Sequence, residues 1–111
     1  MTNEHGYDVD TPVGVKNDAE KAPWDLLPWR ALSAVVGVLE HGRRKYSAWN
    51  WVGVPRARER YFAALQRHMT AWWGGETLDP DSHLRHLAHA GCCVLFLLAL
   101  ELGDTGPRGP T

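Results

Sequence analysis

Histidines and carboxylates gather in the last third of the chain. On a helix, at about 100° per residue, histidines three positions apart share one face. Such a pair can hold one metal ion, and carboxylates in the preceding turn can add oxygen ligands. Carboxylates favour Mg²⁺ or Mn²⁺, whereas histidine shifts the preference towards Mn²⁺ or Zn²⁺. The residues of this group are Glu76, Asp79, Asp81, His83, His86 and His89.

A metal ion is one of two interpretations of this group. In the first, Glu76, Asp79, His86 and His89 together hold a divalent cation, Mg²⁺ or Mn²⁺. In the second, the carboxylates only cap a helix and the histidines line its boundary. His68 lies on the preceding helix and could reach the same place if the two helices pack antiparallel, or it could be a satisfied boundary histidine.

A second group combines positive charge with aromatic rings. Arg43, Arg44 and Lys45 end one expected helix, where cations complement the helix dipole. An arginine fork and a lysine ammonium can also capture phosphate. Asn50 stands between two tryptophans in the segment 49–51, and an amide beside an aromatic plane can address a nucleotide base. The sequence therefore allows a nucleotide pocket or a solvated helix end.

Three helices must position these groups. The spacing of apolar residues predicts a first helix that begins near Trp24, with Pro28 in its first turn. Its apolar stripe runs to about residue 40, and the segment 42–46 closes it. A second helix is expected over 55–73, ended by two glycines. A third is expected from the cap-like segment 79–82 to about residue 100, closed by a glycine at 103. No β pattern or internal repeat is present, so we expect an all-α fold.

The third helix is apolar on nearly every side between Ala90 and Leu100. Two partner helices cannot easily cover all of its faces, and a helix of this kind is usually buried all round. We therefore expect a homo-oligomer, a dimer or higher, in which third helices meet in a helical bundle.

Composition limits the class of protein. A chain of 111 residues forms one domain, and its net charge of −1 excludes a general nucleic-acid binder. Cys92 and Cys93 are adjacent and read as buried apolar residues, which fits a reducing cytoplasm. No signal peptide or membrane span is expected. We expect a flexible arm over 1–22, an all-α domain over 23–103 and a disordered tail over 104–111.

Several blocks of sequence, in order, match a known family. They are Lys21-Ala22-Pro23-Trp24-Asp25-Leu26-Leu27-Pro28, Gly42, Lys45-Tyr46, Asn50-Trp51, Arg67-His68, Ala71-Trp72, Gly74-Gly75-Glu76, Asp79-Pro80, His86-Leu87 and His89-Ala90. With these blocks the chain resembles the phage-associated dATP/dGTP diphosphohydrolase N-terminal family. The resemblance implies a link to MazG-like all-α nucleoside triphosphate pyrophosphohydrolases, which bind a nucleotide and Mg²⁺ between helices of an oligomer.

The resemblance implies roles for individual residues. Glu76 and Asp79 match an ExxD metal element and would be the catalytic carboxylates, whereas the companion ExxE element has no counterpart in this chain. Arg43 and Lys45 would neutralise the phosphates, and Asn50 with Trp51 would contact base or sugar. The matching blocks add further nucleotide contacts at Tyr46, Arg67 and His68.

Three functions follow as hypotheses. As an enzyme, the protein would attack a (deoxy)purine triphosphate with metal-bound water and release pyrophosphate and a monophosphate. As a sponge, it would bind a nucleotide or a host defence signal without cleaving it, which the short supply of carboxylates favours. As a structural module, its polar residues would only support oligomerisation. A phage-encoded protein of any of these kinds would act in the cytoplasm of the host cell.

Overall fold

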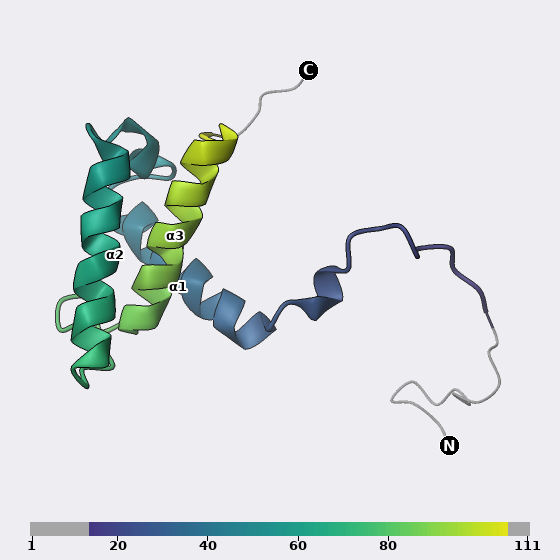
Figure 1. The fold of residues 1–111 in the computed structure, drawn as a ribbon, viewed down its shortest axis with the longest axis horizontal. Coiled ribbons are helices and arrows are strands. Elements are labelled where there is room, and N and C mark those ends of the chain that lie inside the picture. Colours follow the sequence, from purple (N-terminus) through teal and green to yellow (C-terminus); the bar gives the residue numbers. More distant parts are fainter. Residues whose placement is uncertain (1–13, 107–111) are drawn as a thin grey trace.

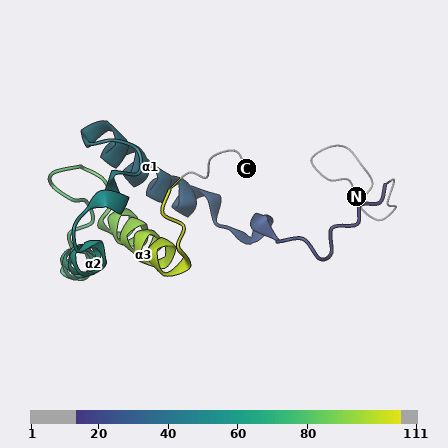
Figure 2. The same ribbon diagram turned by 90° about the horizontal axis from the view of Figure 1, so that it is seen from above.

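The computed structural model describes residues 14–106, and these form an all-α fold, as predicted. Figure 1 shows two antiparallel helices, α2 and α3, side by side, with α1 crossing behind them. Figure 2 shows α1 in a separate layer above the α2–α3 pair and the chain before α1 leading away from the bundle. The elements are η1 (Trp24–Leu26), α1 (Trp29–Lys45), η2 (Asn50–Gly53), α2 (Ala57–Trp73) and α3 (His86–Leu102). The predicted arm and tail fall partly outside the described residues, at 1–13 and 107–111.

The first helix begins later than predicted and ends within the segment 42–46 that was expected to close it. Residues Trp24–Leu26 form a separate short 3₁₀ helix, and Leu27 then adopts an extended conformation with φ −72° and ψ 133°. Proline disfavours the helical conformation in the residue before it, so Pro28 separates the two elements and becomes the N-cap of α1. The helix continues through Gly42 to Lys45.

The second helix agrees closely with its prediction. It begins two residues after Pro55, because Arg56 takes a left-handed conformation with φ 56°. It ends at the expected glycine pair, where Gly75 has φ 101° and donates its N–H to the carbonyl of Trp72. This left-handed glycine turns the chain back towards α3.

The predicted start of the third helix is wrong. Asp79 does not cap a helix; its Oδ1 accepts the backbone N–H groups of Asp81 at 2.7 Å and Ser82 at 3.1 Å within a tight turn. His83 then has φ 62°, and an isolated bridge pairs Leu78 with Arg85. A left-handed residue and an extended pairing both exclude helix at these positions. α3 therefore starts at His86, and His83 lies in the loop.

The core is small and lies where α1 crosses α3. Val38, Ala88 and Cys92 are its buried centre, and Val35 packs against them. A Cβ atom added at Gly91 would lie 3.1 Å from Cγ2 of Val35, so the glycine allows the two helices to approach closely at this crossing. Within residues 14–106, no helix has both the length and the apolar character that a membrane span requires.

Most tryptophans lie outside this core. Trp51 is buried, but the other five keep between 36% and 83% of their surface exposed. The second half of α3 is also incompletely covered. Its large apolar side chains, roughly half or more exposed, are Val94, Leu95, Leu98 and Leu102. The two cysteines are buried free thiols, as expected.

Candidate functional site

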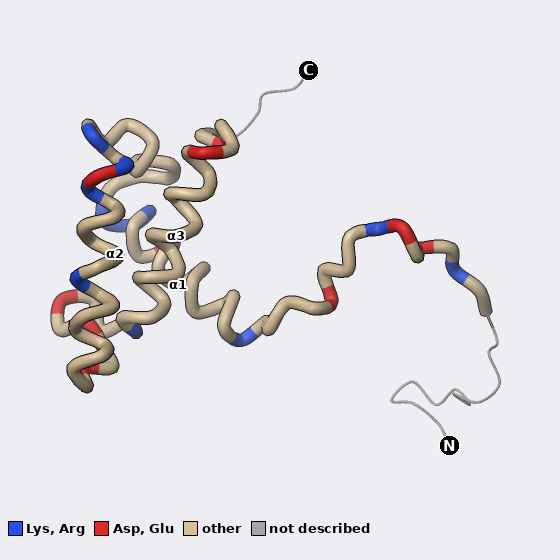
Figure 3. Tube along the Cα trace, in the orientation of Figure 1, with Lys and Arg blue, Asp and Glu red and all other residues tan. Residues whose placement is uncertain are grey.

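Three side chains from α2, α3 and the loop between them meet at the start of α3. Nδ1 of His68 lies 2.9 Å from Nδ1 of His86 and 3.8 Å from Oδ2 of Asp79. Each residue offers an atom that could bind metal within 4.8 Å of the other two. The antiparallel packing of α2 and α3 brings His68 to this place, as the short connection predicts. Figure 3 shows the acidic residues of the α2–α3 loop beside this end of the pair.

Glu76 contacts this cluster from outside. Its Oε1 lies 2.6 Å from Nε2 of His86, whose side chain is 5% exposed, while that of Glu76 is 53% exposed. A carboxylate can only accept a hydrogen bond, so Nε2 of His86 carries a proton, while Nδ1 of the same ring faces His68. Glu76 therefore fixes the orientation of a buried imidazole.

His89 forms the second layer of the cluster. Its ring stacks on that of His68, with centroids 4.5 Å apart and planes 5° apart. Its Nε2 lies 2.7 Å from Oγ of Ser82, which also accepts the backbone N–H of Leu84. His83, which is exposed and left-handed, is not part of this layer.

Burial sets the charge state of the two stacked histidines. Loss of solvent lowers the pKa of His68 and of His89 below the ordinary value, and repulsion between neighbouring histidines adds to the effect. Burial alone would raise the pKa of Asp79, but N–H bonds from Ser82 and Asp81 and the nearby imidazoles lower it overall. At neutral pH the cluster thus combines neutral imidazoles with an ionised carboxylate, which is a suitable ligand state for a cation.

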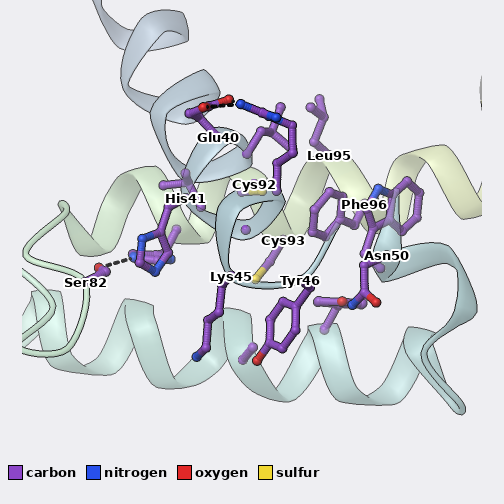
Figure 4. A pocket seen from close by; sticks show the side chains of 18 of the residues that line it. Glu40, His41, Lys45, Tyr46, Asn50, Ser82, Cys92, Cys93, Leu95 and Phe96 are labelled. Carbon is purple, nitrogen blue, oxygen red and sulfur yellow. Dashed lines mark hydrogen bonds and ion pairs between the residues drawn. The ribbon is translucent and has the colours of Figure 1, made fainter. Parts of the chain in front are cut away.

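A cavity of about 670 Å³ extends from this cluster along the inner sides of α1, α2 and α3. Figure 4 shows Ser82 on one side of it and Asn50 on the other, with Lys45 and Tyr46 between them. Most of the predicted nucleotide and metal residues lie on its wall: Arg43, Lys45, Tyr46, Asn50, Trp51, His68, Asp79 and His89. Sequence reasoning thus brought together residues from several elements that the fold places on one cavity.

Three predicted residues do not line this cavity. Arg67 is exposed on α2, outside the wall of this cavity. Glu76 and His86 lie behind the wall, joined to each other by the hydrogen bond described above. They can act on the cavity through His68 and Asp79.

The basic end of α1 is held by a carboxylate that sequence reasoning left without a partner. Glu40 accepts hydrogen bonds from Arg43 at 2.6 and 2.9 Å and from Arg44 at 3.1 Å. The Arg43 guanidinium, with Arg44, lowers the pKa of the Glu40 carboxyl to about 2. Spacings of three and four residues on one helix were the available signal. Nζ of Lys45 lies 5.3 Å from the ring centroid of Tyr46.

The aromatic residues of the cavity differ in their freedom to bind a base. Trp51 stacks on Phe96 with centroids 4.3 Å apart and is 9% exposed, so it serves mainly as core. Trp49 is 41% exposed and has φ 63°, an unusual conformation for a bulky side chain. Trp49 and Asn50 are therefore more accessible to a base than Trp51 is.

Comparison with known proteins identifies the family of this chain. A family profile described as "dATP/dGTP diphosphohydrolase, N-terminal" matches residues 11–107. A protein of Salmonella phage PMBT28, named dATP/dGTP diphosphohydrolase, is 34% identical over 88 residues, which are 79% of this chain and 30% of that protein. The chain thus spans about a third of the length of this relative. No solved structure gives a significant match. The chain belongs to the dATP/dGTP diphosphohydrolase N-terminal family.

Proposed function

We propose that this chain binds a (deoxy)purine nucleoside triphosphate in its cavity and, with a divalent cation, hydrolyses it to a monophosphate and pyrophosphate. One observation carries the proposal: cations, an amide with an exposed aromatic ring, and a histidine–carboxylate cluster line the same cavity. These are the groups that phosphates, a base and a cation respectively need. The printed name of the phage relative supports the same substrate class.

The charges on the cavity wall define where each part of the nucleotide would bind. Lys45 and Arg43 would receive the phosphates, and Tyr46 lies beside them. Asn50 and Trp49 would contact the base on the far side from Ser82. Arg43 already donates from Nε and Nη2 to Glu40, so Nη1 and the second hydrogen of Nη2 would be its donors to phosphate.

The histidine cluster fits a divalent cation. His68, His86 and Asp79 supply two nitrogen donors and one ionised oxygen donor, and no rearrangement of the backbone is needed to bring them together. A bound cation would supply positive charge to phosphate oxygens and lower the pKa of water.

Residues of this chain would perform the remaining steps. In hydrolysis, water adds to the α-phosphorus, the bond from that phosphorus to the bridging oxygen breaks, and pyrophosphate leaves. His89 is neutral near pH 7 and lies on the cavity wall, so it can accept the proton that water loses. Lys45 would balance the charge on the departing pyrophosphate.

A non-catalytic sponge is the second candidate. The observation in its favour is that Glu40, one of the carboxylates on the cavity wall, is engaged by two arginines, which leaves Asp79 as the carboxylate of the histidine cluster. Cleavage centres with several metal ions use more carboxylates than this. A nucleotide or a host defence signal would then be held and not cleaved.

We also propose that the protein acts as a homo-oligomer. The apolar side chains on the second half of α3 are 46% to 72% exposed in one chain, a cost that a second copy would remove. Leu95 and Val36 are exposed and also belong to the cavity wall, so a second copy that covers them would close the cavity on that side.

One experiment separates these functions. The full chain is incubated with a panel of nucleotides and Mg²⁺ or Mn²⁺, and the free and denaturant-released fractions are analysed by chromatography. A monophosphate and pyrophosphate would support the enzyme, and an intact retained nucleotide would support the sponge. If neither is found, both proposals fail and a structural role is left.

A further inference from the structure

We infer that His68, His86 and Asp79 bind one transition-metal ion, such as Mn²⁺ or Zn²⁺, in preference to Mg²⁺, and that Glu76 positions His86 from outside the site. The inference rests on the proposed function for its biological role. The metal site itself can be tested without any nucleotide.

The two histidine donors already face each other. Their Nδ1 atoms are 2.9 Å apart. Two metal–nitrogen bonds of about 2.1 Å, at octahedral or tetrahedral angles, separate the nitrogens by roughly 3.0 to 3.4 Å. To bind one ion, both rings would carry their proton on Nε2, which leaves the two Nδ1 lone pairs for the metal.

The two carboxylate oxygens of Asp79 have different neighbours. Its Oδ1 accepts two backbone N–H bonds that fix the turn, and its Oδ2 lies 3.8 Å from Nδ1 of His68. The turn therefore holds one carboxylate oxygen beside the histidine pair. Both Asp79 and His68 are mostly buried, at 17% and 18% side-chain exposure, which limits competition from water.

Glu76 occupies the place of an outer partner. Metal-binding histidines usually donate their second ring N–H to a carboxylate or carbonyl, which sets the tautomer and orients the ring. The bond of 2.6 Å between Nε2 of His86 and Glu76 has this form.

The donor set indicates the class of metal. Two imidazoles and one carboxylate suit Mn²⁺, Fe²⁺ or Zn²⁺, whereas Mg²⁺ prefers oxygen ligands alone. His89 is a positioning residue in this arrangement, because its Nε2 is bound to Ser82 and its ring stacks on His68. In this inference His68 binds the ion directly, whereas Glu76 and His89, which the sequence predicts as direct ligands, do not.

The test uses the full chain, purified without a histidine tag and without nucleotide. Calorimetric titration with ZnCl₂ or MnCl₂ should show one ion per chain, and MgCl₂ at the same concentrations should give no binding. Co²⁺ should give visible absorption bands of a nitrogen- and oxygen-ligated ion, which report the histidines directly. Binding of Mg²⁺ as tight as that of Zn²⁺, or no binding of Zn²⁺, Mn²⁺ and Co²⁺, would overturn the inference.

Matched variants locate the ion. Asp79→Asn keeps an Oδ1 acceptor for the turn but removes the charged Oδ2, and it should weaken Zn²⁺ binding by at least about a hundredfold. Glu76→Gln keeps the acceptor for His86 and should cost roughly tenfold, as outer partners do. The control Asp81→Asn removes the same charge from an exposed position on the same turn and should change nothing.

Thermal unfolding without metal shows whether each variant is folded. His86 itself is not replaced, because replacing this buried residue risks unfolding the chain. Equal Zn²⁺ affinity in Asp79→Asn and Asp81→Asn would contradict the site. Nucleotide turnover with Mg²⁺ in a protein that fails to bind Zn²⁺ or Mn²⁺ would remove the inference and keep the function. Zn²⁺ binding without any nucleotide binding would keep the inferred metal site and remove the proposed function.

Discussion

The rest of the chain covers the two halves of α3 to different extents. From His86 to Cys93 most side chains of the helix are buried or partly buried, with Leu87 the exception at 44% exposure, and both histidines have partners. From Val94 to Leu102 four large apolar side chains are 46% to 72% exposed, namely Val94, Leu95, Leu98 and Leu102. In a single chain the histidines of α3 therefore have polar partners, whereas its exposed large apolar side chains lack a packing partner. This difference suggests that one chain builds the site and that a second copy completes the core.

The largest effect should come from a charge on the exposed half. Leu95→Asp should dissociate the oligomer or unfold it, because a buried unpaired charge costs several kcal/mol, roughly 3 to 5. Light scattering and thermal unfolding measure both outcomes. Leu78→Asp is the matched control, since Leu78 lies in the α2–α3 loop and is 47% exposed against 46% for Leu95. A folded monomer of the unchanged protein at micromolar concentration would contradict the idea that a second copy covers the second half of α3.

The next effect concerns the satisfied half. Asp79→Asn should reduce metal-dependent nucleotide binding or turnover at least tenfold, about 1.4 kcal/mol. His68→Ala should do likewise, and the double variant should lose little more, because both changes disable one site. If nucleotide binding survives in excess chelator and Asp79→Asn lowers only stability, the turn is purely structural.

A smaller effect is expected at the basic end of α1. Lys45→Ala or Arg43→Ala should weaken binding of a triphosphate more than that of the nucleoside and leave the melting temperature nearly unchanged. Arg30→Ala, an exposed cation at the start of the same helix, is the control. Equal losses for both ligands would show that these side chains do not contact phosphate.

The smallest effect is a pH dependence of stability. Burial lowers the pKa values of His68 and His89 in the folded chain, so below about pH 6.5 the unfolded chain binds more protons. The stability they contribute is complete above that pH and is lost as the pH falls towards 5. Melting temperatures of the metal-free protein should therefore fall between pH 8 and pH 5. A flat or opposite dependence would contradict the buried, neutral state of the cluster.

Sequence reasoning succeeded where the signal was local and periodic. The apolar spacing of α2 and the glycine pair after it gave that helix almost to the residue. The cavity-lining residues in the segment 43–51 were singled out because charge and aromatic rings stand close together in the chain. The all-α class followed from the same periodicity.

Long-range pairing was beyond the same reasoning. An aspartate that bonds N–H groups two and three residues later begins a helix or closes a turn with the same sequence pattern. Asp79 does the second, and only the pairing of Leu78 with Arg85 and the left-handed His83 decide it. The bond from Glu76 to His86 joins residues ten positions apart across that turn. The exposure of most tryptophans likewise depends on contacts that no local pattern records.

The close approach of α1 and α3 at Gly91 links the positions of these two helices. Val35 lies on α1 about 15 Å of helix before Lys45, at about 1.5 Å per residue. A Cβ atom at position 91 would lie 3.1 Å from Cγ2 of Val35, so a side chain there would require Val35 to shift by a few tenths of an ångström. The glycine thus permits the separation of α1 and α3 at which the basic end of α1 and the histidines His68 and His89 line one cavity.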